Sequence, residues 1–373
     1  MNVFAIGMSG HASDGGLERY YFDLLRALPQ AGSRPHGLVV GAADGSCDGG
    51  PAVASFARAG DPVWRRWVAM RRTAPAYVRA ADVVVSHFAP NAFPILPRVR
   101  ERPFVVHFHG PWALEGAVHG GTRLKTRLRT MIERRVYAAA ARFVVLSRAF
   151  AGILAREYRV SPDRIRIVRG GVDLGRFRVP ADRRASRERL GWPLDRPIVT
   201  TVRRLVASKG VEDLIDAAAI ARRAVPDLLV KILGTGPLRD QLARRIAESG
   251  LGDCVQLAGY VPDDEMLIAA YRASNLTIVP SIAFEGFGLV VIESLACGTP
   301  ALVTNVGGLP ETIGALAPQL VLERGPQSLA RGIAGALGGC IPLPSEAACI
   351  AHARSFDWNA VAHDVNAVYR EAM

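Results

Sequence analysis

Two glutamates that flank a glycine turn are the side chains with the clearest chemical potential in this sequence. Glu285 precedes the turn Gly286–Leu289, and Glu293 follows it inside an expected helix. Glycines in the turn let the backbone approach a ligand closely, and the free N–H groups at the start of the helix favour an anion. One carboxylate can accept hydrogen bonds from sugar hydroxyls and the other from a ribose. The stretch therefore predicts a surface for a phosphorylated sugar.

Two cations at the end of an expected strand form the second candidate group. The segment VRRLVASKG places Arg204 and Lys209 five residues apart. On a strand followed by a loop, both can converge on one diphosphate and balance its charge. Arg203 is the neighbour of Arg204 and competes for the same position. The alternative is two surface cations on a loop.

Glycines and histidines form the third group, in the first half of the chain. Gly15 and Gly16 follow the first strand and open a helix, which offers backbone donors to a phosphate. In HFHGPWALE, His107 lies within a strand and is expected in the core, whereas His109 lies at the end of the strand and is assigned to the site. We expect the two rings to point to opposite faces, which argues against a metal site.

The stretch 279–311, VPSIAFEGFGLVVIESLACGTPALVTNVGGLPE, resembles the donor signature of retaining glycosyltransferases of family 4. The resemblance implies an α/β GT-B fold, in which two Rossmann-like doubly wound domains face each other across a cleft. It also implies that Glu285 contacts the donor sugar and Glu293 the ribose. The backbone amides that it places on the diphosphate or the sugar are those of Phe287, Gly288 and Leu289.

The resemblance extends to the other candidate groups. Arg204 and Lys209 match an Arg and a Lys of the family, although Arg203 stands where the family usually has glycine. Gly15–Gly16 matches its glycine-rich loop, and His109 matches a histidine near the sugar and its phosphate. Weaker matches are RGGVD (169–173), GTGP (234–237) and GYVPDDEM (259–266). The candidate contacts to the base or ribose are Gly234, Tyr260 and Val261.

The elements that position these residues follow from the apolar pattern. Short continuous apolar runs alternate with amphipathic stretches, which predicts parallel sheets covered on both faces. We expect an acceptor-side domain over 1–175, an Arg/Asp/Pro-rich linker over 176–196 and a donor-binding domain over 197–356. An amphipathic helix over 357–373 is expected to pack back on the first domain. Ligands of such sheets bind at the carboxyl ends of the strands.

Composition restricts the class of protein. The chain has 373 residues, 21% of them charged, and a formal net charge of +12. Residues 1–180 carry the whole basic excess, which favours an anionic partner or reflects a GC-rich genome. No apolar run reaches the ~20 residues of a membrane span, and no signal peptide is recognisable. Five scattered cysteines predict a reduced, cytoplasmic chain, with peripheral contact to the inner face of the membrane as an option.

Two basic stretches bear on the acceptor. WRRWVAMRR (64–72) interleaves Trp with Arg, and RLKTRLRTMIERR (123–135) places apolar residues near one helix face. Such helices can lie on anionic membranes, which suggests a lipid-linked acceptor. The alternative, which we favour for 123–135, is that the apolar faces pack on the sheet. A soluble small-molecule acceptor stays open.

The resemblance implies a metal-independent enzyme that moves a hexose or N-acetylhexosamine from a nucleotide-sugar donor, with UDP favoured, to a hydroxyl. The alternatives are a GDP-mannose-dependent mannosyltransferase and an epimerase-like enzyme of the same fold. An inactive nucleotide-binding relative is disfavoured because the Glu and Arg/Lys sets are intact. A nucleic-acid-binding protein is disfavoured because no recognition helix, aromatic platform or zinc pattern is present. No cofactor is expected.

Overall fold

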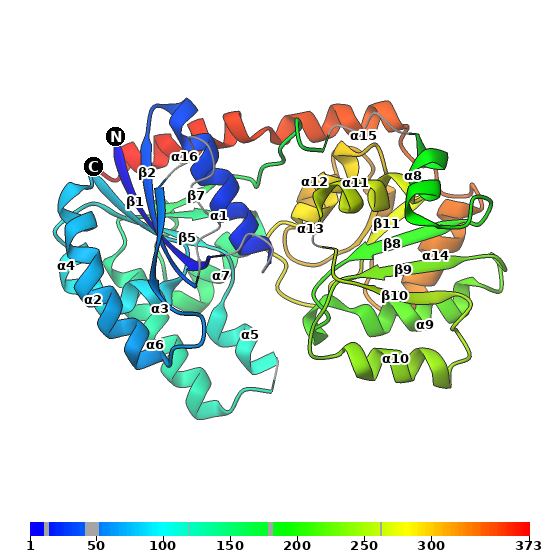
Figure 1. The fold of residues 1–373 in the computed structure, drawn as a ribbon, viewed down its shortest axis with the longest axis horizontal. Helices are drawn as coiled ribbons and strands as arrows, with labels where there is room; N and C mark the ends of the chain where they lie inside the picture. Colours follow the sequence, from blue (N-terminus) through cyan, green and yellow to red (C-terminus); the bar gives the residue numbers. More distant parts are fainter. Residues whose placement is uncertain (11–14, 42–51, 119, 178–181, 262) are drawn as a thin grey trace. The chain divides into compact units, whose positions relative to one another are not determined.

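The computed structural model describes residues 1–10, 15–41, 52–118, 120–177, 182–261 and 263–373. They form two compact units: unit 1 is Met1–Gly171 with Asp357–Met373, and unit 2 is Val172–Phe356. Each unit is a parallel sheet with helices on both faces (Figure 1). The predicted class of two doubly wound α/β domains is confirmed.

Unit 1 is built on a seven-stranded sheet in which all neighbouring strands are parallel. In spatial order the strands are β3 (Ala52–Ala57), β2 (Arg34–Val40), β1 (Asn2–Ser9), β4 (Val83–Ser86), β5 (Phe104–Phe108), β6 (Arg142–Val145) and β7 (Ile165–Ile167). Strand β4 is buried along its whole length. Such a continuous apolar run is typical of a parallel strand covered on both sides.

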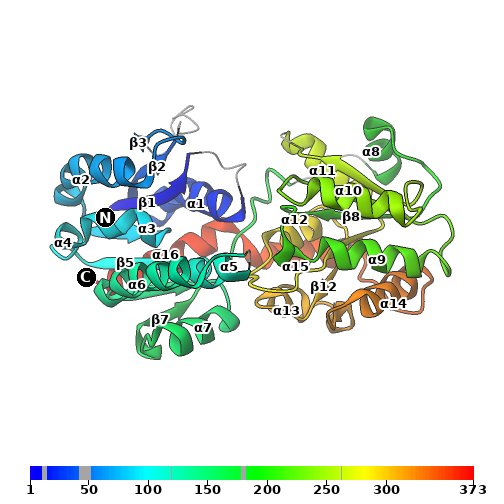
Figure 2. The ribbon, with the colours of Figure 1, turned by 90° about the horizontal axis from the view of Figure 1, so that it is seen from below.

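Helices of unit 1 cover the two faces of this sheet. They are α1 (Gly16–Ala27), α2 (Val63–Ala80), α3 (Ala89–Ala92), α4 (Leu96–Val99), α5 (Trp112–Val118), α6 (Arg123–Ala139), α7 (Arg148–Tyr158) and α16 (Trp358–Glu371). Phe4 and Ile6 of β1 share one core cluster with Met70 of α2 and Val136 of α6. Helix α1 packs beside α16 (Figure 2).

The C-terminal helix α16 belongs to unit 1. Asn366 donates to the backbone oxygen of Ala31 at 2.6 Å and accepts from the Ser33 hydroxyl at 2.7 Å. Glu371 accepts from Arg166 at 2.8 Å. Helix α16 is therefore tied to residues 31–33 by buried polar contacts of Asn366, and to the rest of unit 1 by buried apolar side chains such as Val365 and Val368.

Two helices of unit 1 expose apolar side chains among arginines. On α2 these are Val63, Trp64 and Val68, and on α6 they are Leu124, Leu128 and Met131, with 40–78% of each side chain exposed. The neighbouring Ile132 is buried, as packing on the sheet requires. Our preferred explanation, that the apolar face of 123–135 packs on the sheet, is therefore wrong for Leu124, Leu128 and Met131.

Unit 2 is built on a six-stranded sheet, again with all neighbouring strands parallel. In spatial order the strands are β10 (Val255–Gly259), β9 (Leu229–Leu233), β8 (Ile198–Val202), β11 (Leu276–Val279), β12 (Ala301–Thr304) and β13 (Val321–Leu322). The order of the strands reverses between β8 and β11. This makes their carboxyl ends the switch point at which doubly wound sheets bind ligands.

The helices of unit 2 also fall into two layers. They are α8 (Arg183–Leu190), α9 (Val211–Ala221), α10 (Arg239–Glu248), α11 (Asp264–Ala273), α12 (Leu289–Ala296), α13 (Leu309–Ile313), α14 (Pro326–Leu337) and α15 (Glu346–Ala353). Figure 1 shows α9 and α10 on one side of the strands and α11 and α12 on the other.

The segment 176–196 differs from the linker that we expected. Its described residues contain α8, which packs on α11 within unit 2. Arg187 is buried and donates to the backbone oxygen of Ala273 at 2.9 Å and to the Asn275 side chain at 2.8 Å. The segment has few apolar residues, but a buried arginine with several acceptors attaches it to the domain. The boundary between the two units lies at Gly171/Val172, whereas we expected the first domain to end at residue 175.

Candidate active site

The candidate site in unit 2 is an ion cluster at the switch point. Glu285 Oε2 accepts hydrogen bonds from Lys209 Nζ at 2.9 Å and from Ser281 Oγ at 2.8 Å, and it also contacts the Arg203 guanidinium. Arg203 donates to Ser281 Oγ at 2.7 Å. Residues 203–209 follow β8, whereas 281 and 285 follow β11, so the strand order brings these side chains together.

Charge determines the ionisation of this cluster. Burial alone would raise the pKa of Glu285, but Arg203 and Lys209 outweigh it and hold this pKa well below its usual range. Glu285 is therefore a carboxylate at every physiological pH. Arg203 and Lys209 place two cations at the carboxyl ends of these strands, and cations in this position suit a diphosphate.

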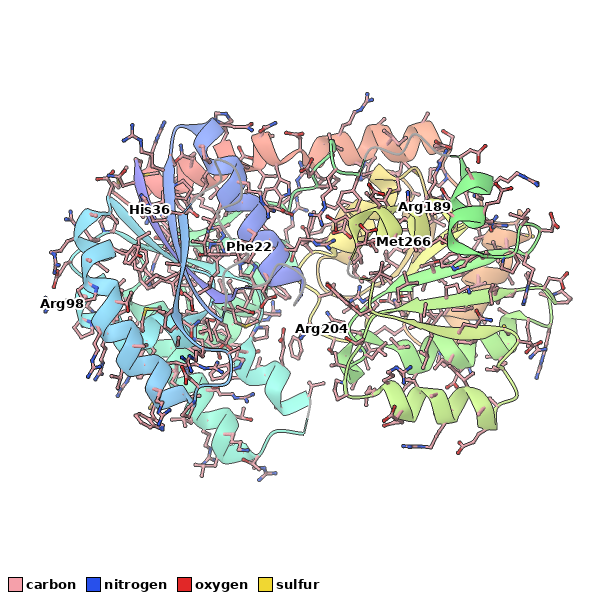
Figure 3. The ribbon with its side chains drawn as sticks, in the orientation of Figure 1. Phe22, His36, Arg98, Arg189, Arg204 and Met266 are labelled. Atoms are coloured by element: carbon pink, nitrogen blue, oxygen red, sulfur yellow. The ribbon has the colours of Figure 1, made fainter. Side chains whose placement is uncertain are left out.

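The arginine that pairs with Glu285 is Arg203, the neighbour of the Arg204 that we assigned to the diphosphate. The Arg203 side chain is 4% exposed and paired with Glu285, whereas Arg204 is exposed on the same loop (Figure 3). The Arg203 amide continues the ladder by donating to the Leu233 oxygen at 2.8 Å. An exposed guanidinium at this edge can still meet an anionic ligand, so a phosphate contact from Arg204 stays a prediction.

Backbone packing fixes the loop that carries Glu285. The Glu285 oxygen accepts from the Gly308 amide at 2.8 Å. A Cβ at Gly307 would lie 2.0 Å from that oxygen, so only glycine fits there. Phe284 adopts φ 45°, a conformation that costs a non-glycine residue about 1–3 kcal/mol. Such strain is typical of functional loops and persists here because the GGLPE segment packs against the loop.

The glycine turn after Glu285 ends on helix α12. Gly286 is partly exposed, and Gly288 is the N-cap of α12 with φ 95°. Phe287 is buried and packs edge-to-face on Phe356 at 5.6 Å between ring centroids. The buried Phe287 side chain therefore fixes the backbone of residues 286–289. That its amides hold a diphosphate or a sugar stays a prediction.

Glu293 lies inside α12, as the sequence predicts. Its side chain is buried in α12 and accepts from the Tyr271 hydroxyl of α11 at 2.8 Å. The structure thus gives Glu293 a structural role in joining two helices. The ribose contact stays a prediction.

The weaker candidates lie on loops at the same edge of the sheet. Gly234 follows β9, and a Cβ there would lie 1.8 Å from the Arg203 backbone oxygen, so its glycine is needed to pack the loop that carries Arg203. Tyr260, 45% exposed, and the partly exposed Val261 follow β10. These positions suit a base or ribose, and the contacts themselves stay predictions.

In unit 1, the glycine and histidine candidates follow β1 and β5. Gly15 is the N-cap of α1, and a Cβ on Gly16 would meet no atom within 4 Å. Residues 11–14 of the same loop lie outside the described residues. His109 follows β5, and its imidazole Nε2 lies 3.0 Å from Nδ1 of His87, a residue that follows β4. Our sequence reasoning missed His87, although it follows its strand just as His109 does.

The expectation that His107 and His109 point to opposite faces is wrong. Residues two apart on a strand share a face, and the ring centroids of these two histidines lie 6.0 Å apart. His107 is buried, as predicted, with Nε2 at 2.8 Å from the Tyr369 hydroxyl and Nδ1 at 3.4 Å from the Tyr20 hydroxyl. Burial lowers the pKa of His87 and of His107 well below the usual value, and that of His109 to about 3. All three imidazoles are therefore neutral.

A buried carboxyl group supports the loop after His109. Glu133 of α6 accepts from the Ala113 amide at the start of α5 at 3.3 Å, and from the hydroxyls of Tyr137 and Tyr158 at 3.3 and 2.8 Å. Burial raises its pKa to about 7, although these hydrogen bonds oppose the rise. The network fixes where the chain turns from β5 into α5.

Known families match both units. A family model described as "Glycosyl transferases group 1" matches residues 182–355, and one described as "Glycosyltransferase Family 4" matches residues 14–176. Parallel sheets with this strand order and an Arg/Lys/Glu cluster at the switch point fit a glycosyltransferase of the GT-B fold. The chain belongs to glycosyltransferase family 4, the group 1 glycosyl transferases.

Two relatives agree with this family. The chain is 35% identical over 264 residues to a D-inositol 3-phosphate glycosyltransferase of Thermobispora bispora, covering 68% of this chain and 61% of the relative. It is 33% identical over 306 residues to D-inositol 3-phosphate glycosyltransferase 1 of Catenulispora acidiphila, covering 78% and 72%. The match thus spans about three fifths of the first of these relatives.

The solved structures support the fold. Sucrose-phosphate synthase from Thermosynechococcus elongatus matches with a TM-score of 0.78 and 24% identity, covering 100% of this chain and 98% of the other. Anabaena HepE in complex with UDP-glucose matches with a TM-score of 0.80 and 20% identity over the full length of both chains.

The ion cluster generates a prediction on stability. Glu285→Gln removes a carboxylate that pairs with two largely buried cations, so we expect unit 2 to lose about 3 kcal/mol of unfolding free energy. Pyrophosphate can replace the lost negative charge, so it should raise the melting temperature of Glu285→Gln more than that of the wild type. Differential scanning fluorimetry measures both.

The matched control for this prediction is Glu248→Gln, which makes the same change on the exposed end of α10. We expect wild-type melting and a wild-type pyrophosphate response from it. If Glu285→Gln and Glu248→Gln have equal melting temperatures and equal pyrophosphate shifts, then Glu285 does not stabilise unit 2 by neutralising Arg203 and Lys209.

Proposed function

We propose that the protein is a retaining glycosyltransferase that moves a hexose or N-acetylhexosamine from a nucleotide-diphosphate sugar, with UDP favoured, to a hydroxyl group. The observation that carries the proposal is the cluster of Arg203, Lys209 and Glu285 at the switch point of unit 2. The structures of HepE in complex with UDP and glucose and with UDP-glucose support the choice of donor. A GDP-mannose-dependent reaction and an epimerase-like reaction are the alternatives that a donor screen distinguishes.

The chemistry is a substitution at the anomeric carbon. The bond from this carbon to the diphosphate oxygen breaks, and a bond to the acceptor oxygen forms on the same face of the sugar. The acceptor proton moves to the leaving phosphate oxygen. Arg203 and Lys209 offset the negative charge that grows on the diphosphate, and preorganised charges of this kind supply the largest part of many rate enhancements.

Glu285 would act by orientation and not as a nucleophile. Its carboxylate is already held by two cations and the Ser281 hydroxyl, which lowers its electron density and fixes its direction. A carboxylate held in this way can accept from sugar hydroxyls. Neutral His109 can contact the sugar or its phosphate through a ring N–H without adding charge. No step of this mechanism requires a metal ion. We therefore expect the transfer reaction to be metal-independent.

The names of the relatives support a phosphorylated polyol as a small-molecule acceptor. The basic excess of residues 1–180 agrees, because cationic surfaces attract phosphorylated ligands. A nucleic-acid partner has no support from the strand order or from the family.

A second candidate acceptor is a lipid-linked sugar on an anionic membrane, and the exposed residues of α2 and α6 favour it. Both helices pack on the same core cluster of unit 1. A hollow on α6 is lined by Arg127, Met131, Arg134 and Arg135, among others, which combines an apolar floor with cations for lipid phosphates. No helix among the described residues meets the length and hydropathy of a bilayer span. Contact of this kind would be peripheral.

The proposed donor chemistry predicts a specific loss in Lys209→Ala. Removing one preorganised cation should lower kcat about 10²–10³-fold and leave the donor KM within about 3-fold. Lys231→Ala is the matched control, because Lys231 lies on β9 over Trp192 and beside Gln256. It should keep wild-type rates.

The assay for this prediction screens UDP-, GDP-, ADP- and dTDP-sugars against inositol phosphate and simple polyols. Proton NMR of the product reads the anomeric configuration, which should match that of the donor. Inversion of configuration, or wild-type kcat in Lys209→Ala, would contradict the proposed chemistry.

The membrane candidate predicts that Trp64→Ser combined with Leu124→Ser weakens sedimentation with phosphatidylglycerol vesicles at least about 10-fold, because two exposed apolar side chains are lost. Phosphatidylcholine vesicles should bind neither form. Ile220→Ser on α9 of unit 2 is the control for an exposed apolar residue. If the wild type does not bind anionic vesicles at low salt, the membrane candidate is refuted and the small-molecule acceptor is the remaining candidate.

A further inference from the structure

His87 forms a contact that the proposed function does not use. Its Nδ1 lies 3.0 Å from His109 Nε2, a distance at which one nitrogen must carry a proton and the other a lone pair. The two rings are inclined by only 19°, with centroids 5.2 Å apart. The other nitrogen of His87, Nε2, is buried and has no partner among the described residues.

Metal binding is the first alternative for this cluster, because nitrogens of His87, His107 and His109 lie within 4.8 Å of one another. However, His107 already has a tyrosine hydroxyl at each nitrogen. Its ring also stacks on His87, at 4.2 Å between centroids and 18° between planes. Imidazole lone pairs lie in the ring plane, so two rings stacked face to face cannot aim them at one ion. The geometry favours a hydrogen-bonded network.

We propose that His87 is a positioning residue that fixes His109 in one neutral tautomer, with the proton of His109 on Nδ1. The buried and unpartnered Nε2 of His87 determines which of the two histidines donates this hydrogen bond. An orphaned buried N–H is rarer in folded proteins than an under-used acceptor. The proton of His87 therefore lies on Nδ1 and is donated to His109 Nε2. Since Nε2 of His109 accepts, neutral His109 must carry its proton on Nδ1.

The fixed tautomer defines what His109 can offer. His109 is the partly exposed member of the cluster, whereas His87 and His107 are buried. With Nε2 occupied by His87, the remaining group is an Nδ1–H donor. A donor suits an oxygen acceptor, such as a sugar hydroxyl or a phosphate oxygen, and rejects a ligand N–H or a metal ion. This consequence rests on the proposed function, whereas the tautomer itself does not.

The test is ¹⁵N NMR of the histidine-labelled protein without any substrate, with His109 assigned by the resonance lost in His109→Gln. We expect one tautomer in the wild type, with Nδ1 protonated and Nε2 bare. His87→Phe keeps an aromatic ring but removes the hydrogen bond, so His109 should become a tautomer mixture. His87→Asn keeps an N–H near the position of Nδ1 and should restore the single tautomer.

Kinetics give the second readout. His87→Phe should lower kcat roughly 10-fold, the change that a hydrogen bond of typical net strength supports, with the donor KM within about 2-fold. His87→Asn should recover most of kcat. His36→Phe makes the same change at an exposed position of β2 and should leave both parameters unchanged.

Three results would overturn the proposal. They are a wild-type His109 protonated on Nε2, a His109 tautomer that is unchanged in His87→Phe, and stoichiometric zinc in the purified protein with metal-shifted His109 nitrogens. Because the wild-type spectrum needs neither a variant nor a substrate, misfolding of His87→Phe does not remove the test. A correct tautomer in a protein that transfers no sugar would refute the proposed function and leave the positioning role of His87 intact.

Discussion

Pairing of Glu285 with Arg203 and Lys209 is the interaction on which the donor half depends. It joins the loop after β8 to the loop after β11, at the point where the strand order of unit 2 reverses. A carboxylate between two cations keeps its charge despite burial. The backbone contacts of Gly307 and Gly308 with Glu285 hold the loop in this path, in which Phe284 has φ 45°.

The fold class followed from the sequence because parallel strands are continuous apolar runs that alternate with amphipathic helices. Glu285 and Lys209 were identifiable because a glycine turn and a cation after a strand carry local signatures. The pairing of Glu285 with Arg203 was not identifiable, because the side on which an arginine leaves the end of a strand depends on one residue of register. Glu293 shows the same limit, since its contact with Tyr271 comes from the packing of two helices.

The histidines show a different kind of limit. The spacing of His107 and His109 did contain the answer, since alternate strand residues share a face, and our expectation misapplied that rule. His87 could be recognised only once β4 and β5 were known to be neighbours. In unit 2, α8 had no apolar signature because a buried arginine attaches it to the domain. Contacts between distant segments made by polar side chains are the part that periodicity does not predict.

Hydrogen–deuterium exchange with and without UDP tests whether a nucleoside diphosphate binds to the loops around the Glu285 cluster. We predict slower exchange in the loop 203–210 and in the turn 286–289, with less change in the interior strands of unit 1. Glu285→Ala should reduce that protection. Protection confined to unit 1, or no protection of 286–289 at saturating UDP, would show that the nucleotide does not bind at the Glu285 cluster.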